Sequence, residues 1–410
     1  MRTKVILLLT GSILLLLTIF NLDLVPLRRE ISDMEIVMVA GFDKTEKGYE
    51  ISFLKREEQA STSGGGSGET SNDTQVISIE ANDFNTAMNH LQTMTDKYIT
   101  ISHIKYYIIG ENSAKEDLSH IVDTIARGNQ IRLDARVYIA KSMTAKEFLK
   151  QASNTDYKVE DKLYNMEDSF ITERVSTEAS LINLCHITMN EYGSGIVATL
   201  EFGSTEDNED KSEIELSDEP AKKNKKEIPF GFGGAGIVKN MKLIGYLTTD
   251  ETAVVNYIRN INNVNVIKVE DNNDFISFGV EQINVNINFN FDDKGIMNEI
   301  ILNATFKANY EEVKANEPVF SYTNIQKYEK KINEIVEKQL VNIIKKEIEM
   351  NVDFLDLRKK LEVTHPFLYE KNKENFNSIL KNAKITAKSN GKVQTTYDIV
   401  ETNIYQERGK

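Results

Sequence analysis

The sequence of 410 residues has no tryptophan, five histidines and a single cysteine, Cys185. One cysteine cannot close an internal disulfide or form a cysteine metal site, so we expect Cys185 to be a small buried residue. The histidines stand far apart in the chain, at His90, His103, His120, His186 and His365. None falls in an H-x-x-x-H or H-E-x-x-H arrangement, the spacing that puts two metal ligands on one helix face. The sequence therefore predicts no metal site.

Positive charge is also scarce. The chain has 49 Lys and Arg residues against 63 Asp and Glu residues, a formal net charge of −14. It has no basic stripe with interleaved aromatic residues, which is the usual footprint of a nucleic-acid site. We therefore expect nucleic acid and anionic lipid headgroups to be poor partners.

Motifs for catalysis or cofactor binding are missing as well. An enzyme needs a nucleophile beside a base, paired carboxylates in a cleft, or a metal centre. Ser194 lies outside any G-x-S-x-G context, and carboxylates are too abundant for one pair to stand out. The glycines at 231–236 precede a strand instead of linking a strand to a helix, so they do not match a dinucleotide fingerprint. The sequence predicts a protein with no catalytic, cofactor-binding or metal-binding residues.

Only one apolar run is long enough to reach across a membrane. Arg2 and Lys4 precede Val5–Phe20, and four apolar residues can extend this run: Leu22, Leu24, Val25 and Leu27. A helix rises ~1.5 Å per residue, so this run covers most of a hydrocarbon core of ~30 Å. No A-x-A-like peptidase site follows it. We expect residues 1–27 to form an uncleaved transmembrane anchor; a cleaved signal peptide and a buried core helix are the alternatives.

Residues 28–200 predict a mixed α/β domain, because strand patterns alternate with helix patterns. A hairpin is expected to join Ile36–Phe42 to Tyr49–Lys55 through a turn that ends at Gly48. Residues 60–72 are rich in glycine and serine and are expected to form a flexible loop. Further strands are predicted at Val76–Ile79, His103–Ile109 and Arg136–Ala140.

Residues 204–229 interrupt this pattern. Eight carboxylates lie between Glu206 and Glu219, and four lysines follow within 222–226. So charged a segment cannot bury a core, and we expect a solvated linker that is acidic and then basic. A calcium site at Glu206–Asp210 is the alternative with a specific function, but these residues lack the ligand spacing of an EF-hand loop.

Residues 230–410 predict an α+β domain. Apolar and polar residues alternate along Ile283–Phe291 and Ile300–Tyr310, which indicates a hairpin with one buried face. The predicted helix Asn324–Met350 carries an apolar stripe of the right width to cover that face. With a final strand near Ala383–Val400, we expect a twisted antiparallel sheet packed by one long amphipathic helix.

Four Ser/Thr–Glu/Gln pairs at the spacing of a capping box predict where helices begin. They are Ser113 with Glu116, Thr144 with Glu147, Thr248 with Glu251, and Thr323 with Gln326.

Four blocks of the sequence carry a resemblance to a known family. They are Arg28–Val37 with Ala40–Lys44; His103 with Ile109–Glu111, Arg127, Arg132, Val137, Ala140 and Lys141; Gly234–Lys239 with Lys242–Leu247 and Glu251–Thr252; and Glu329–Glu347 with Asp353–Leu355 and Pro366. In this order they resemble the Ger(x)C family, the C subunits of bacterial spore germinant receptors. One feature departs from the family: members usually carry a lipid-modified cysteine before the opening block, and Leu24–Leu27 contains none. The transmembrane segment would then replace the lipid.

The resemblance implies two or three α/β domains and a non-enzymatic subunit. Such a subunit assembles with two integral membrane partners, the A and B subunits, in the inner membrane of a dormant spore. The complex responds to small nutrients and triggers germination, and the resemblance does not say that the C subunit binds nutrient itself.

Two rival functions remain. An anchored enzyme such as a cell-wall hydrolase would show a cleft with two carboxylates, one of raised pKa. A solute-binding receptor domain would show a deep pocket between its halves.

We predict that the mature protein keeps its N-terminus, because the apolar run lacks both a lipid-attachment cysteine and a peptidase site. Intact-mass analysis and N-terminal sequencing of the membrane fraction should therefore find residues 1–27 still attached. A new N-terminus between Asn21 and Arg29 would show instead that this segment is a cleaved signal.

Overall fold

The structure is a computed structural model. It describes residues 33–56, 74–128, 132–155, 157–173, 176–189, 194–203, 230–261, 265–271, 274–314 and 321–394, together with Lys4, Ile6 and residues 10–12. The predicted anchor lies almost entirely outside these residues, as do the predicted loop 60–72 and the linker 204–229. Within the described ranges no helix has both the length and the apolarity needed to cross a bilayer.

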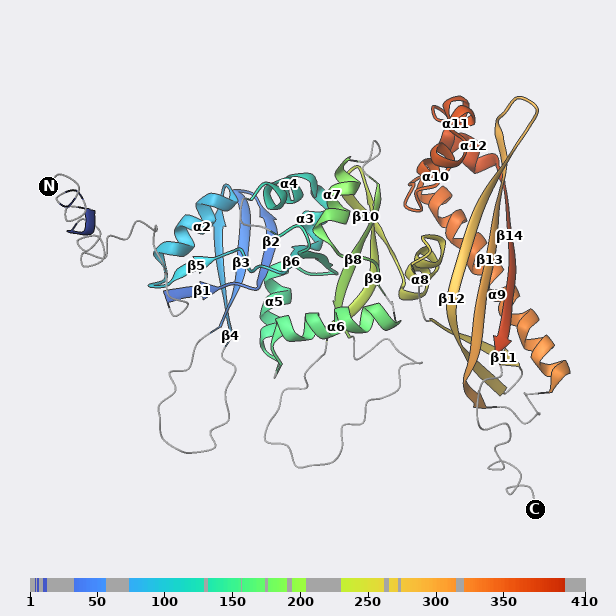
Figure 1. The fold of residues 1–410 in the computed structure, drawn as a ribbon, viewed down its shortest axis with the longest axis horizontal. Coiled ribbons are helices and arrows are strands. Elements are labelled where there is room, and N and C mark those ends of the chain that lie inside the picture. The colour runs from blue at the N-terminus through green and yellow to red at the C-terminus, as the bar shows by residue number, and fades with distance from the viewer. Residues whose placement is uncertain are drawn as a thin grey trace, which may run out of the picture.

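Two sheets lie one after the other along the long axis, with helix α8 (Thr249–Ile258) between them (Figure 1). The larger sheet has eight strands in the order β10-β9-β8-β7-β6-β2-β3-β4. Their bounds are β2 Val39–Thr45, β3 Gly48–Arg56, β4 Thr74–Ala81, β6 Tyr106–Gly110, β7 Arg136–Ala140, β8 Gly195–Phe202, β9 Phe230–Lys239 and β10 Lys242–Leu247. The four central strands run parallel, and antiparallel strands complete both ends. The predicted mixed α/β architecture and the β2–β3 hairpin are confirmed.

Helices cover both faces of the larger sheet and make three layers. Apolar residues of α2 (Phe84–Thr93), α4 (Ser119–Arg127) and α7 (Leu181–Met189) pack on one face. Those of α5 (Ala145–Ser153) and α6 (Val159–Glu173) pack on the other. A short helix, α3 (Glu111–Glu116), follows β6, and β1 (Met34–Ile36) pairs with β5 (Tyr98–Thr100) as a small parallel ribbon.

The larger sheet continues beyond the predicted linker. We expected the second domain to begin at residue 230, but β9 pairs with β8 and β10 pairs with β9, so residues 230–247 extend the first sheet. Pairing with β9 also satisfies the backbone edge that β8 would otherwise leave open. The glycine run forms part of β9. A Cβ on Gly234, whose φ is +82°, would lie 2.3 Å from the Leu247 carbonyl oxygen, so the glycine permits a close backbone approach.

The smaller sheet has the order β11-β12-β13-β14. The strands are β11 Asn265–Asp271, β12 Asp274–Phe291, β13 Met297–Lys314 and β14 Lys384–Gln394. The predicted β12–β13 hairpin is confirmed, with Val285 and Leu302 among the fully buried residues on its inner face. The prediction of an all-antiparallel sheet is wrong for β14, which runs parallel to β13. The intervening helices form a crossover that returns the chain to the end where β13 begins, as a parallel pair requires.

Helix α9 (Tyr322–Met350) covers the inner face of this sheet and also closes the edge of β14. Its predicted stripe is buried, including Tyr328, Ile332, Val336 and Leu340. Three α9 side chains at four-residue spacing accept hydrogen bonds from backbone N–H groups of β14: Glu337 from Ser389 at 2.8 Å, Asn333 from Gly391 at 2.6 Å, and Glu329 from Val393 at 3.1 Å. The helix side chains thus take the place of a further strand at an edge that would otherwise be open to association.

Two of the four predicted capping boxes form, at Thr144 and Thr248. Ser113 instead lies inside α3, where its hydroxyl accepts a hydrogen bond from the Lys44 backbone N–H at 2.7 Å. Helix α9 is capped by Ser321 and not by Thr323. Cys185, a residue of α7, is only half buried, because its side chain packs at the rim of the core. The environments of Ser113 and Cys185 depend on contacts with residues far away in the sequence. The spacing of neighbouring residues therefore could not predict these environments.

We predict that Leu340→Asp destabilises the second sheet by roughly 3–5 kcal/mol, because it places an unpaired charge in a core position that is 0% exposed. Thermal melts of the full chain would measure this. Lys338→Asp, at an exposed position on the same helix, is the matched control and should melt close to wild type. Equal melts for Leu340→Asp and wild type would contradict the packing of α9 on the hairpin.

Candidate functional site

The histidines occupy separate environments in the fold. His120 lies against Tyr49 with ring centroids 5.3 Å apart, and His365 lies 5.1 Å from the Phe291 ring. Within the described residues no group of three or more His, Cys, Asp or Glu side chains is placed to hold a metal ion.

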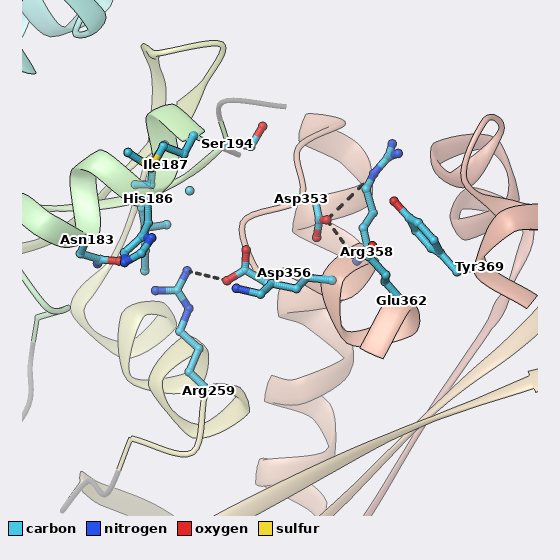
Figure 2. Close-up of a pocket in the computed structure, with 14 residues that line it drawn as sticks. Asn183, His186, Ile187, Ser194, Arg259, Asp353, Asp356, Arg358, Glu362 and Tyr369 are labelled. Atoms are coloured by element: carbon cyan, nitrogen blue, oxygen red, sulfur yellow. Dashed lines mark hydrogen bonds and ion pairs between the residues drawn. The ribbon is translucent and has the colours of Figure 1, made fainter. Parts of the chain in front are cut away.

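A cavity of about 480 Å³ lies where the two sheets meet. One wall comes from α7 and the start of β8, and the other from residues 353–356, α10 (Leu357–Thr364) and α11 (Pro366–Asn372); Arg259, after α8, lies between them (Figure 2). Six of its fourteen lining residues are charged and two more are titratable: Arg259, Asp353, Asp356, Arg358, Lys359 and Glu362, with His186 and Tyr369. Pockets for drug-like ligands are mostly apolar. This cavity therefore favours water and charged groups.

Arg259 crosses the joint between the two sheets. Its Nη2 donates to the Phe354 carbonyl oxygen at 2.9 Å and lies 3.8 Å from the Asp356 carboxylate. Burial lowers the pKa of this guanidinium, and the carboxylates around it, Asp356 foremost, oppose that shift. An arginine keeps its charge under such a shift, so Arg259 remains a cation that ties α8 to the loop before α10.

Asp353 caps α10. Its carboxylate accepts hydrogen bonds from the backbone N–H groups of Leu357 at 2.7 Å and Arg358 at 3.1 Å. Burial raises the pKa of Asp353 to about 6, although the two backbone donors act in the opposite direction. The Arg358 guanidinium reaches across to Asn377 Oδ1 at 2.6 Å. Both oxygens of Asp353 are therefore engaged in positioning a helix.

Glu347 is a buried carboxyl that the sequence analysis missed. It is 1% exposed on the inner stripe of α9, and one oxygen accepts a hydrogen bond from the Leu355 backbone N–H at 2.7 Å. The other oxygen has no hydrogen-bond partner among the described residues. Burial, with Asp353 adding to it, raises the pKa of Glu347 well above its ordinary value. A glutamate seven positions after Leu340, within an apolar stripe, was the signal that could have identified it.

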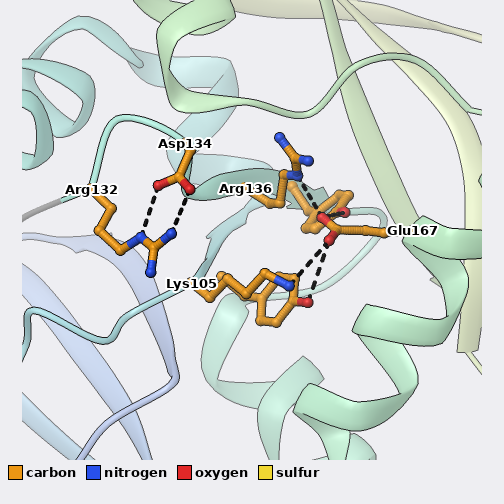
Figure 3. Close-up of polar contacts among 7 residues, drawn as sticks. Lys105, Arg132, Asp134, Arg136 and Glu167 are labelled. Carbon is orange, nitrogen blue, oxygen red and sulfur yellow. Dashed lines mark hydrogen bonds and ion pairs between the residues drawn. The ribbon is translucent and has the colours of Figure 1, made fainter. Parts of the chain in front are cut away.

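A second polar cluster gathers around Glu167 of α6 (Figure 3). Its carboxylate accepts from Arg136 Nε at 2.7 Å and from the Tyr138 hydroxyl at 3.2 Å. The Tyr106 hydroxyl lies 3.5 Å away and Lys105 Nζ lies 3.6 Å away. These partners stand just before or within β6 and β7, so the cluster ties α6 to the start of two parallel strands. Its donors and acceptors satisfy one another, which is the arrangement of a structural network.

Residues from two of the family-like blocks meet in the fold. The Asp43 carboxylate accepts hydrogen bonds from the backbone N–H groups of Ala145 at 2.8 Å and Lys146 at 2.9 Å, and so caps α5. A Cβ on Gly110 would lie 2.0 Å from an oxygen of Asp43. The buried aspartate thus leaves no room for a side chain at position 110, so these two blocks are in direct contact in the fold.

Comparison with known families agrees with this order of blocks. A family model described as "Spore germination protein N-terminal domain" matches residues 28–201. A second, described as "Spore germination B3/ GerAC like, C-terminal", matches residues 233–397. The chain belongs to the Ger(x)C family. The resemblance found in its sequence is therefore confirmed.

Two curated Ger(x)C relatives come from Bacillus subtilis (strain 168). The protein YfkR, named for spore germination, is 30% identical over 136 residues, which are 32% of this chain and 34% of YfkR. Spore germination protein KC is 25% identical over 143 residues, which are 34% of this chain and 35% of that protein. The matched segments thus span about a third of each relative.

A solved structure shares the fold. The crystal structure of the GerBC protein aligns with a TM-score of 0.54 at 15% identity, over 86% of this chain and 96% of that chain. At this identity the likeness shows the fold alone. It extends across both sheets of the Ger(x)C protein described here.

We predict that Glu347→Gln makes the stability of the protein less dependent on pH. The pKa of Glu347 is raised in the folded state, so the folded state binds this proton more tightly than the unfolded chain. The stabilisation is complete below the unfolded pKa and is lost as the pH rises through the folded pKa. Between the two pKa values, wild type should lose about 1.4 kcal/mol per pH unit relative to the variant.

Chemical denaturation between pH 4 and pH 9 would measure both slopes. Glu349→Gln, the same substitution at an exposed position two residues along α9, is the control and should keep the wild-type slope. Parallel curves for Glu347→Gln and wild type would contradict a raised pKa at this buried carboxyl.

Proposed function

We propose that this Ger(x)C protein is the membrane-anchored, non-catalytic C subunit of a nutrient germinant receptor. It is held at the extracytoplasmic face of the spore inner membrane and works by binding integral A and B subunits. The observation that carries the proposal is the pair of family matches, which follow each other in order over residues 28–201 and 233–397. The apolar run at 5–20 supplies the anchor.

The environment of the pocket carboxylates supports a non-catalytic role. A wall hydrolase would need a carboxyl of raised pKa that is free to transfer a proton. Asp353 has the raised pKa, but its oxygens cap α10. Ser194 and His186 both line the cavity, yet the Ser194 hydroxyl points away from the His186 ring (Figure 2). Asp353 and Arg259, the groups in this cavity with contacts to the backbone of residues 354–358, therefore support the structure of the joint.

A solute-binding receptor domain is the second candidate, and the cavity between the two sheets favours it. Thermal melts in the presence of single nutrients distinguish the two functions. A saturable rise in melting temperature that Arg259→Gln abolishes would support solute binding. An unchanged melt leaves assembly with membrane partners as the function.

The anchor matters because tethering raises the effective concentration of the folded part near membrane partners without any new contact. We predict that a chain lacking residues 1–27 stays folded but fails to restore the nutrient response to a strain without the native gene. Joining residues 28–410 to an unrelated transmembrane segment should recover much of the response.

Germination of complemented spores, with equal protein levels and equal melts for each form, is the measurement. A full response from the untethered chain would refute the role given to residues 1–27. Failure of the chain with the foreign anchor would show that the native segment makes specific contacts.

A further inference from the structure

The corner between α10 and α11 exposes large apolar side chains to solvent. Phe367 is 90% exposed, the highest value among the exposed large apolar residues of the described chain, and Val363 is 73% exposed. These residues flank the bend at His365 and Pro366 where one helix ends and the next begins. In Figure 1, α10 and α11 stand at the end of the second sheet, beside the turn of the β12–β13 hairpin.

This corner is held firmly in place. Asn372, 0% exposed at the end of α11, donates to the Gly295 carbonyl oxygen at 2.9 Å and accepts from the Met297 backbone N–H at 2.9 Å. The His365 ring lies 5.1 Å from the Phe291 ring. These contacts fasten α11 to the hairpin turn. The exposure of Phe367 is therefore a feature of a fixed surface.

The charge around the corner is opposite in sign to that of the whole chain. Residues 357–373, which span α10, α11 and the C-cap residue of α11, contain four lysines and one arginine against two glutamates, a net charge of +3 in a chain of −14. Lys360 precedes Val363 by three residues on α10, and Lys371 follows Phe367 by four on α11. Side chains at these spacings share a helix face. The negative net charge of the whole chain conceals this local excess of positive charge.

We propose that the α10–α11 corner docks on an anionic lipid surface, with Phe367 and Val363 entering the interface and the lysines facing the headgroup phosphates. An apolar wedge flanked by lysines is the chemistry of interfacial membrane binding. The inference rests on the proposed membrane association. Strand β1 lies toward the opposite end of the long axis (Figure 1), so an anchor before β1 and this corner would together hold the axis along the membrane.

The size and charge of the patch favour lipid over protein. A stable protein interface buries about 800 Å² on each partner around an apolar core. Here two large apolar side chains stand among lysines, too small an apolar area for such a core. Each lysine near an anionic surface contributes about 1 kcal/mol, so Lys360 and Lys371 together can strengthen the contact roughly thirtyfold.

The absence of tryptophan provides the test. Phe367→Trp gives a full-length chain with a single indole at the corner, and Tyr322→Trp gives a matched reporter at a 77% exposed position at the start of α9. Each protein is reconstituted into vesicles of phosphatidylcholine alone or with phosphatidylglycerol. In the anionic vesicles, we expect the indole emission of the Phe367→Trp chain to shift to the blue and to be quenched by brominated acyl chains. The emission of the Tyr322→Trp chain should stay unchanged.

Lys360→Gln and Lys371→Gln, combined in the Phe367→Trp chain, should remove the shift while leaving the melting temperature unchanged. Vesicle flotation of the same samples separates the two proposals. A Phe367→Trp chain that floats with vesicles while its indole stays solvent-exposed overturns the docking corner and leaves the membrane-anchored function standing. Equal shifts in neutral and anionic vesicles overturn the role of the lysines. A shift that needs a co-reconstituted integral membrane protein overturns lipid as the partner.

Discussion

Helix α8 is buried on every side from Thr252 to Ile258, and the arrangement of the two sheets depends on this burial. Its apolar residues share one core with Ile237 of the larger sheet and with the inner face of the smaller one. Its polar residues fix the orientation: Asn256 donates to the Ser176 carbonyl oxygen at 2.7 Å. Beyond its end, Asn260 exchanges hydrogen bonds with both backbone groups of Val285. Apolar burial supplies most of the stabilisation, and the hydrogen bonds of Asn256 and Asn260 to distant backbone groups select one geometry.

The same joint explains why so many charged groups lie in one place. Glu347, Asp353 and Arg259 each bond to backbone groups of residues 354–358. This short segment connects α9 to α10 and forms one wall of the cavity. Between the two helices the backbone of this segment is not part of a helix or sheet, and water is partly excluded there. Its backbone N–H and C=O groups therefore need hydrogen-bond partners from side chains. The charged cluster is thus a consequence of turning the chain sharply at a buried position.

The sequence predicted the elements whose cause is local. The period of two in β12 and β13, the stripe on α9 and the caps at Thr144 and Thr248 depend on neighbours within a few residues. What it missed depends on distant contacts. The parallel direction of β14 follows from the crossover through four helices, and Asn333 bonds a strand edge 58 residues away. At the joint, Glu347 could have been found as an acid within an apolar stripe. Arg259 could not, because nothing near it in the chain distinguishes it from any helix-terminal arginine.

The uneven distribution of charge has a physical consequence for a protein beside a membrane. Residues 357–373 carry +3 of a total of −14, so the rest of the chain carries −17. An anionic surface repels the larger part and attracts the corner between α10 and α11. Such a charge asymmetry orients the molecule before any contact forms, over a distance of about 8–10 Å at moderate salt. In the proposed receptor subunit, a tether at the N-terminus would limit how far the molecule can rotate away. Orientation by charge and confinement by the tether would then act together to present one fixed side of the fold to integral partners.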